Sequence, residues 1–515
     1  LKLTPINRRR LTNFKANRRG WWSFWLFLTL FVLSLFAEFI ANDRPLLVRY
    51  KGEWLFPVAV TTPANEFGVR LTTTTDWDVG CAAPTRVVDP NGAASAVTTT
   101  YDLFCRPATV TKPLGDYEHT TWTENQATGW ISHVTRPAPT GQTTELFTDT
   151  LYDGLARVIR VTTSGPSTSQ SIVVDTGWDA RGNRASETLP RYAGATAQTR
   201  STVFDALARP IRLSEPDGAT TNTTYGLSSE PTGFDTSTVT DPNGNVATIH
   251  YDAFRHEIRR DRLPATGQTA TTRITVDALG RVTGIVDPIG AIWSNTWDSL
   301  GRRTAAGDPD LGDWAYAYDA AGRLTQQTDS RGNVTTLTYD NLGRELTRTV
   351  TPSGGTADVT RSVWDEVRGG YANLGRLSRQ ASTVARICRD YDAAGRIVQD
   401  RWTLPGDTTT ACGTDPAGSE SFVLSTLYDA GGRVIGRTWP DGDVTGTIAA
   451  PMTYDAAGRL LSIPGVITSF AYAAGGQTTQ AAYANGVTTT FTWYAPRAWL
   501  QSIAHARSGS TFETK

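Results

Sequence analysis

Histidines are the first side chains that could carry acid–base or metal chemistry: His119, His133, His250, His256 and His505. None of them lies in an H-E-x-x-H motif or beside a cysteine pair, which are arrangements that hold zinc. The strings G-x-G-x-x-G, G-x-S-x-G and G-x-x-x-x-G-K before Ser or Thr do not occur, which argues against a nucleotide-binding loop and a serine hydrolase. We therefore expect no catalytic residue, cofactor, metal or small-molecule substrate, and a protein that is not an enzyme.

Two short acidic clusters are candidates for weak calcium binding. One combines Asp308, Asp310 and Asp313, and the other consists of Asp441 and Asp443. Neither fits a full calcium-binding loop. Solvated acidic turns are the favoured interpretation of both clusters.

Four cysteines in 515 residues are too few for a disulfide framework or a zinc site. They form two pairs with the same spacing of 24 residues, Cys81 with Cys105 and Cys388 with Cys412. This spacing is about one repeat unit and can place two positions side by side on neighbouring units. We therefore hypothesise two disulfides in an oxidising compartment, with isolated buried thiols as the alternative.

A short motif recurs along most of the chain: an aromatic residue, Asp, two permissive residues, Gly and Arg. Its central copies begin at residues 276, 297, 318 and 339, so the repeat is 21 residues long. Asp in the first position and Gly in the fourth are typical of a type I turn, which we call the motif turn. The turn residues to which we assign structural roles are Asp102, Asp153, Asp277, Gly280, Asp298, Gly301, Asp319, Gly322, Asp340, Gly343, Asp392, Gly395, Asp429, Gly432, Asp455 and Gly458.

Arginine ends nearly every copy of the motif. We predict that each Arg pairs with a neighbouring Asp and covers an aromatic ring, the alternative being an Arg row that meets anionic glycans or a partner surface. His256 takes the Arg position of its copy, which predicts a role at a strand start. One copy is assigned to Tyr371–Arg376, where Ala replaces Asp, and a degenerate copy begins at Tyr494.

Short strands must position these turns. Between motif copies lies a second turn of the same class, which we call the linking turn, for example Asp89–Gly92, Asp241–Gly244, Asp287–Gly290 and Asp329–Gly332. One unit is thus two strands of about six residues and two turns, and such small hairpins must stack on their neighbours. We predict an all-β repeat protein in which antiparallel hairpins form one spiralling sheet. A β-propeller is the alternative, because two units span 42 residues and Trp-Asp pairs begin at residues 77, 178, 297 and 364.

The repeated Y-D-x-x-G-R motif resembles the RHS/YD-repeat family over residues 65–505. That resemblance implies a hollow RHS-type β-shell, which in the family can enclose a C-terminal toxin. Such proteins occur among bacterial polymorphic toxins, insecticidal toxin complexes and teneurin-like adhesion proteins. Family toxin cores usually continue into a plug or self-cleavage segment and an effector, whereas residues 506–515 are interpreted as a truncated tail, and closure of the shell stays open.

The N-terminal part differs in composition. Residues 1–58 carry ten Lys or Arg and three Asp or Glu, a net charge of +7, whereas the remaining residues carry 39 against 47, a net charge of −8. No basic surface large enough for nucleic acid is expected. Residues 1–20 are interpreted as a basic cytoplasmic segment and residues 21–41 as a transmembrane helix. A cleaved signal peptide and a buried core helix are the alternatives.

The segment from about residue 3 to 58 also resembles the N-terminal region of the permease subunit of oligopeptide or microcin C ABC importers. Nothing after Val58 is hydrophobic enough to span again, so the resemblance covers a permease's first helix without its pore. Residues 42–64 are the predicted junction to the repeats.

These features predict a membrane-anchored or exported shell, a scaffold or container of a polymorphic-toxin or cell-contact system. The alternatives are a peptide-importer permease component and a surface adhesin that binds carbohydrate or protein. Expected partners are the membrane, through residues 21–41, and a toxin effector or a cell-surface glycan or protein. The expected location is the inner membrane, with a cytoplasmic N-terminus and extracytoplasmic repeats, or the secreted or cell-surface fraction.

Overall fold

The structure is a computed structural model that describes residues 25, 48–50, 53–55, 59–65, 68–125, 129–229, 232–407, 411–415, 417–507 and 510–514. Apart from Trp25, the secondary structure of these residues consists of strands and two short 3-10 segments, η1 (Ala93–Ser95) and η2 (Pro113–Gly115). A search of the described residues finds no helix with the length and apolar character that crossing a membrane requires. The predicted segments 1–20 and 21–41 lie outside the described residues, except for Trp25.

Two compact units make up the chain: residues 1–61 with 72–87, and residues 62–71 with 88–515. The predicted repeat region therefore contributes to both units. Strands that lie wholly in the first unit are β1 (Val48–Tyr50), β2 (Glu53–Leu55), β3 (Ala59–Thr61) and β4 (Thr72–Asp78), and β5 (Ala83–Val88) ends at the boundary. Strand β1 pairs with β2, and β3 pairs with β4, in both cases antiparallel.

The second unit contains a long series of short strands. Its earlier strands are β6 (Val97–Tyr101), β7 (Pro107–Thr111), β8 (Tyr117–Asn125), β9 (Gly129–Arg136), β10 (Leu146–Tyr152), β11 (Val158–Ser164), β12 (Ser171–Trp178), β13 (Arg184–Thr188), β14 (Arg191–Tyr192), β15 (Thr199–Phe204), β16 (Pro210–Ser214), β17 (Thr220–Ser229), β18 (Thr232–Thr240), β19 (Val246–Tyr251), β20 (Glu257–Leu263), β21 (Ala270–Val276), β22 (Val282–Val286), β23 (Ile292–Trp297) and β24 (Arg303–Asp308). Its later strands are β25 (Gly312–Tyr318), β26 (Leu324–Thr328), β27 (Val334–Tyr339), β28 (Glu345–Thr351), β29 (Asp358–Trp364), β30 (Leu377–Ala381), β31 (Arg386–Tyr391), β32 (Ile397–Leu404), β33 (Glu420–Tyr428), β34 (Val434–Thr438), β35 (Val444–Thr445), β36 (Thr453–Tyr454), β37 (Leu460–Ser462), β38 (Ile467–Tyr472), β39 (Thr478–Tyr483), β40 (Val487–Tyr494), β41 (Trp499–Arg507) and β42 (Ser510–Thr514).

Strands that follow one another in sequence pair antiparallel from β15 to β35, so this part of the second unit is one continuous sheet. Threonine, valine and aromatic residues suit such strands because their branched or flat side chains pack on a pleated surface. In β25, exposed and half-buried residues alternate, as expected for a sheet strand with two different faces. The predicted spiral of antiparallel hairpins is confirmed. The propeller alternative is wrong, because the continuous pairing is not divided into separate blades.

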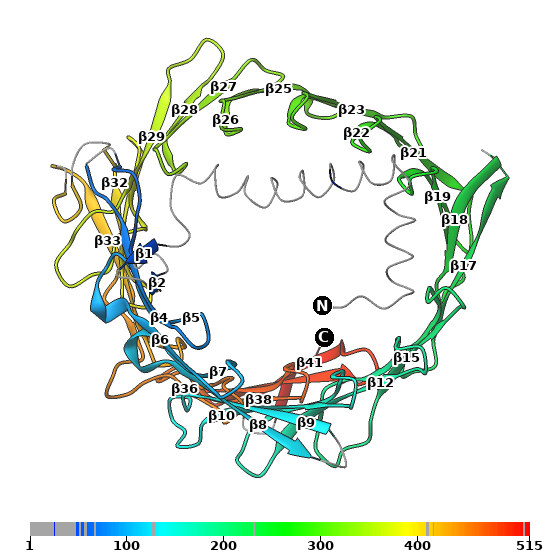
Figure 1. The fold of residues 1–515 in the computed structure, drawn as a ribbon, viewed down its shortest axis with the longest axis horizontal. Coiled ribbons are helices and arrows are strands. Elements are labelled where there is room, and N and C mark those ends of the chain that lie inside the picture. Colours follow the sequence, from blue (N-terminus) through cyan, green and yellow to red (C-terminus); the bar gives the residue numbers. More distant parts are fainter. Residues whose placement is uncertain are drawn as a thin grey trace. The chain divides into compact units, whose positions relative to one another are not determined.

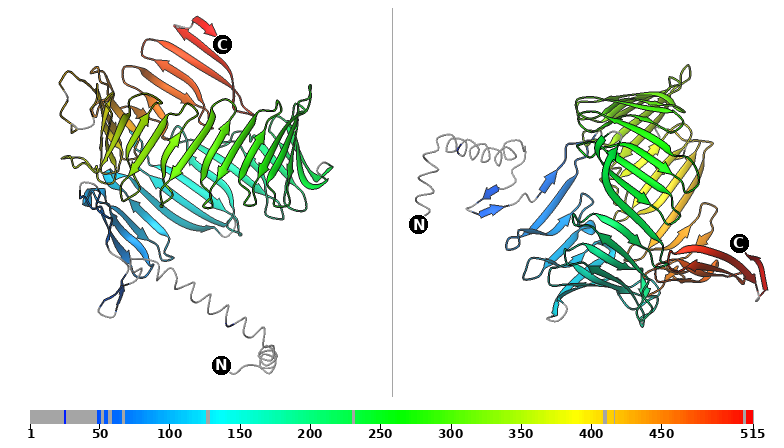
Figure 2. Two further views of the ribbon diagram at one scale, coloured as in Figure 1. Left: turned by 90° about the horizontal axis from the view of Figure 1, so that it is seen from above. Right: turned by 90° about the vertical axis from the view of Figure 1, so that its right-hand side faces the viewer.

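Figure 1 shows the strands of the second unit following one another around a ring, from β6 to β35. The chain then continues beside its own earlier strands, and β38 to β42 form a further five-stranded sheet, drawn in orange and red in Figure 2. A sheet of this kind has little apolar interior. Among the described residues, the largest fully buried side chains are mostly polar, and they include Arg386, Asn373 and Thr403.

Candidate functional site: the turn ladder and the seam

The motif turns share one backbone geometry, which the turn after β25 illustrates. The Gly322 N–H donates to the Asp319 carbonyl at 3.0 Å, and the Asp319 N–H donates to the Arg323 carbonyl at 2.9 Å. Gly322 has a φ of 84°, a left-handed conformation that glycine adopts without steric cost. This is a type I turn followed by a glycine bulge, a common three-residue hairpin connection. The predicted roles of Asp and Gly agree with this geometry.

The Asp carboxylate of a motif turn binds the turn's own backbone and its own Arg. In the turn after β21, Asp277 accepts the N–H groups of Leu279 and Arg281 at 2.9 and 3.0 Å and the Arg281 Nε at 2.7 Å. The side-chain hydrogen bond from Arg281 is the main cause that lowers the pKa of Asp277 below its ordinary value. The carboxylates that accept both the backbone N–H and the Nε of the Arg four residues later are Asp102, Asp153, Asp205, Asp277, Asp298, Asp319, Asp340, Asp392, Asp429 and Asp455.

The same Arg also joins each unit to the next. Arg302 donates from Nη1 to the Asp319 carbonyl at 3.0 Å, and its guanidinium lies 4.9 Å from the centroid of the Tyr318 ring. The Tyr318 hydroxyl in turn donates to the Arg303 carbonyl at 2.8 Å. The aromatic residue, Asp and Arg of the motif therefore form a ladder along the stacked turns. As predicted, these arginines pair with Asp and cover aromatic rings.

One predicted copy of the motif is placed wrongly. Strand β29 ends at Trp364 and β30 begins at Leu377, so residues 365–376 form a single connection. The Asp365 N–H donates to the Arg376 carbonyl at 3.1 Å, as an Asp does in a motif turn. Trp364 and Asp365 are thus the aromatic and acidic residues of this turn, and Tyr371 lies in an insertion. We call residues 364–376 the interrupted turn.

Contacts between residues nearly 300 positions apart show that the second unit packs against itself. The Leu374 N–H donates to Asn91 Oδ1 at 2.8 Å, and Asn91 Nδ2 donates to the Leu374 carbonyl at 3.0 Å. In these contacts, a motif turn of the later strands, or the aromatic residue before it, meets a linking turn, a loop or the short strand β14 of the earlier part. We call this line of contacts the seam. Further pairs across the seam are Asn341 with Ala64, Thr140 with Asp429, Gln142 with Tyr454, Tyr192 with Tyr472, and Asp217 with Arg497.

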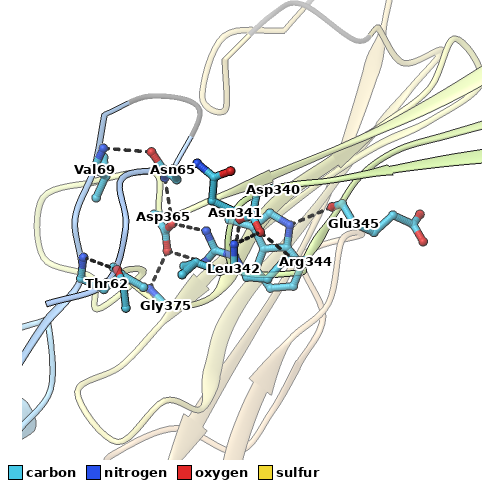
Figure 3. Close-up of polar contacts among 12 residues, drawn as sticks. Thr62, Asn65, Val69, Asp340, Asn341, Leu342, Arg344, Glu345, Asp365 and Gly375 are labelled. Carbon is cyan, nitrogen blue, oxygen red and sulfur yellow. Dashed lines mark hydrogen bonds and ion pairs between the residues drawn. The ribbon is translucent and has the colours of Figure 1, made fainter. Parts of the chain in front are cut away.

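The interrupted turn carries a buried charge at the seam (Figure 3). Arg344 donates to both carboxylate oxygens of Asp365, at 3.1 and 2.7 Å, while the Gly375 N–H donates to it at 2.7 Å. Asn65, from the loop that precedes β4, donates from Nδ2 to the same carboxylate at 2.9 Å. The Asp365 side chain is fully buried and the Arg344 side chain is 14% exposed. Removing such a charged pair from water is costly, and the further hydrogen bonds to its carboxylate offset this cost.

A disulfide holds the neighbouring connection between β32 and β33. Cys388, in β31, bonds to Cys412, 24 residues later. Beside it lies the fully buried Arg386, which donates to the Thr414 carbonyl at 2.8 Å and to the Asp415 carboxylate at 2.9 Å. Cys81 and Cys105 are disulfide-bonded as well. No free cysteine is present among the described residues.

The acidic clusters hold their own turns. Asp308 accepts the N–H groups of Asp310 and Leu311 and the indole N–H of Trp293. In the other cluster, Asp441 accepts the Asp443 N–H at 3.0 Å. No group of three or more potential metal ligands occurs within the part of the chain that the structure describes.

One histidine lies in a chain of polar contacts that sequence reasoning missed. His250 contacts Ser228 Oγ through Nδ1 and Asp261 through Nε2, each at 3.0 Å. A Ser–His–Asp series can activate a nucleophile, but catalysis also needs access for a substrate. Ser228 and His250 are both buried, and Asp261 also accepts hydrogen bonds from Arg259 and Thr271. The three residues lie far apart in the sequence, on β17, β19 and β20, so no local motif could have indicated them. Of the other histidines, His256 pairs with Asp252 in the Arg position, as predicted.

The fold and its turn ladder define an all-β shell built of stacked hairpin repeats. Residues 276–311 and 318–356 match the RHS Repeat family, which confirms the resemblance drawn from the motif. Among solved structures, the chain is similar to TcdB2–TccC3, with a TM-score of 0.73 and 17% identity over 88% of this chain and 27% of that chain. It is also similar to the Photorhabdus luminescens Tc holotoxin pore, with a TM-score of 0.68 and 15% identity over 86% of this chain and 30% of that one.

The permease-like resemblance is confirmed too. Over 71 residues, 14% of this chain, it is 63% identical to the peptidoglycan transport system permease protein YejE of Agrobacterium fabrum. Over 76 residues it is 50% identical to the inner membrane ABC transporter permease protein YejE of Escherichia coli. The chain spans about a fifth of the length of these permeases and less than a third of the solved chains named above.

Proposed function

We propose that this chain is a non-enzymatic RHS-repeat shell that serves as a container or scaffold in a toxin-related or cell-contact system. The seam is the observation that carries this proposal. Motif turns of later strands bind linking turns of earlier strands. These contacts join successive parts of the narrow hairpin sheet into a wider wall of the shell. The fold similarity to TcdB2–TccC3 supports a toxin-related role, and the effector would be supplied by another segment or protein.

The polar residues support a structural role in place of catalysis. The motif carboxylates accept hydrogen bonds from backbone N–H groups and arginines. Asp365 and Arg386 are buried and form ion pairs within the sheet. In the Ser228–His250–Asp261 series, Ser228 and His250 are buried, and Asp261 is also bound by Arg259 and Thr271. A lack of catalysis by the purified chain, with Ser228→Ala as the control, would agree with this proposal. Hydrolysis of an ester substrate that Ser228→Ala abolishes would contradict it.

A protected passenger tests the container role. We would fuse a short peptide with a protease site after Lys515 and compare its cleavage with that of the same peptide free in solution. A container slows cleavage of the fused passenger, and seam variants such as Asn91→Ala restore it. Equal cleavage rates for the fused and free peptides would contradict the container role.

Membrane anchoring through residues 21–41 is part of the same proposal. The permease-like segment, with its basic start, would hold the shell at the inner membrane with the repeats outside the cytoplasm. A topology reporter fused after Phe56 is expected to read extracytoplasmic. A cytoplasmic signal from this reporter would contradict the arrangement, although it would leave the shell fold unaffected.

A further inference from the structure

The linking turn at Trp439–Gly442 departs from its counterparts in one residue. Its backbone is ordinary, because the Gly442 N–H donates to the Trp439 carbonyl at 3.0 Å and the Trp439 N–H donates to the Asp443 carbonyl at 2.8 Å. At the first position, however, it has Trp439, where Glu215–Gly218 and the linking turns named above have an acidic residue, such as Asp287, which accepts two backbone N–H groups. A residue that departs from the sequence preference of its turn, without a stabilising contact that explains it, often marks a functional position.

A hollow of about 520 Å³ opens at this turn. It is lined by Phe422, Trp439, Pro440, Asp441, Asp443 and Thr445. The two aromatic residues, Phe422 and Trp439, are 38% and 39% exposed. No lysine or arginine lines this hollow in the described part of the chain, and Arg437 lines the neighbouring one, 5.9 Å from the Trp439 ring centroid. Aromatic faces beside two carboxylates are complementary to an organic cation.

The seam contains a linking-turn carboxylate that already binds an arginine. Asp217 occupies the third position of the linking turn Glu215–Gly218, as Asp441 does in its own turn, and each carboxylate accepts the N–H two residues later. Arg497, from a motif turn of the later strands, donates to both Asp217 oxygens at 2.8 and 3.2 Å. The Arg497 guanidinium also lies 5.3 Å from the centroid of an aromatic ring, that of Trp499.

We propose that the hollow at Trp439 is a docking site for an arginine on a turn of a partner polypeptide. Asp441 lies on a linking turn, as does Asp217, which receives Arg497 within the seam. A guanidinium can bind a carboxylate through two hydrogen bonds while stacking on an aromatic face, and both groups are present here. This site concerns recognition of a partner and does not depend on the container role.

The test uses the purified 515-residue chain and two small probes. Nα-acetylarginine amide carries the charge, and its citrulline counterpart has nearly the same shape without it. In calorimetric titrations, the arginine probe should bind at least fivefold more tightly than the citrulline probe. The pair Asp441→Asn and Asp443→Asn should weaken the arginine probe at least fivefold, and Trp439→Leu should weaken it more than Trp439→Phe.

A matched control replaces two other exposed acids, Asp310→Asn and Asp358→Asn, which change the net charge by the same amount away from the hollow. This control should leave binding unchanged, and thermal unfolding should be similar for all variants. Equal binding of both probes, or unchanged binding after loss of Asp441 and Asp443, would overturn the proposal. Self-association of the chain that the same double variant abolishes would overturn the assignment to a different polypeptide and give the site to a second copy.

Discussion

The regular repeats and the interrupted turn use the same residue types in different ways. In the regular repeats, Asp298 and Asp319 are 21% and 23% exposed and bind groups of their own turn. At the interrupted turn, Asp365 is fully buried and binds Asn65, 300 residues away. Exposed ion pairs contribute little individually, whereas a buried charge becomes costly when its partner is lost. The regular repeats therefore distribute stability over many similar turns, and the seam concentrates it at a few residues.

The comparison also predicts how far the effect of a lost contact extends along the chain. A ladder contact joins a turn to its own unit and to the next one, so its loss remains local, as in other repeat proteins. The contacts of Asp365 hold the loop at Asn65, a motif turn and the interrupted turn together. Loss of this side chain removes a tie between strands that are distant in sequence.

Replacement of Asp365 by Ala is expected to have the largest effect and tests the comparison directly. The change leaves the buried Arg344 with one of its two carboxylates, that of Asp340, and should lower the free energy of unfolding by about 3–5 kcal/mol, measured by urea titration. Asp365 also has a φ of 67°, which Asn tolerates better than Ala. Asp365→Asn therefore separates the loss of charge from the backbone effect.

The matched change in the regular repeats is Asp319→Ala, which removes a carboxylate with the same role in its own turn. It should destabilise the protein clearly less than Asp365→Ala. If the two variants unfolded at the same urea concentration, the distinction between regular repeats and interrupted turn would fail.

Removal of the Cys388–Cys412 disulfide should have the next largest effect. A bond across 24 residues stabilises by about 3 kcal/mol in the chain-entropy account. In Cys388→Ser with Cys412→Ser, hydrogen exchange should increase mainly in residues 404–420, because the disulfide holds that connection. Alkylation without reductant should label no thiol in the native sequence, and labelling of all four cysteines would contradict both disulfides.

The repeats could be predicted from the sequence because their interactions are local. The Asp, Gly and Arg of a motif turn lie within five residues, so spacing alone indicates their contacts. The seam could not be predicted in this way, because Asn91 and Leu374 have no shared spacing or motif. The insertion after Asp365 also led to a wrong assignment of its turn, because Tyr371 and Arg376 have the spacing of a separate motif copy.

Two asparagines in equivalent linking turns isolate the contribution of the seam. Asn91 and Asn243 both occupy the third position of an Asp-Pro-Asn-Gly turn, but Asn91 exchanges two hydrogen bonds with Leu374, whereas Asn243 is exposed. Asn91→Ala should lower the free energy of unfolding by about 1–2 kcal/mol. Asn243→Ala, the control, should change it little, and equal effects of the two variants would show that the seam contributes no stability.

The smallest expected effect is a pH dependence of the regular repeats. Side-chain hydrogen bonds from Arg157 and Arg281 are the main causes that lower the pKa values of Asp153 and Asp277 below the ordinary value of 3.8. The folded state therefore binds these protons more weakly than the unfolded state, so the stabilisation is complete above pH 3.8 and is lost as the pH falls through the folded pKa values. Thermal unfolding between pH 6 and pH 2 should show a falling melting temperature below about pH 4. The double variant Asp153→Asn with Asp277→Asn should have a lower melting temperature at pH 6. Its melting temperature should also fall less steeply with pH, because two of the titrating groups are gone. An unchanged slope in that variant would mean that the motif carboxylates are not the groups whose protonation loosens the repeats.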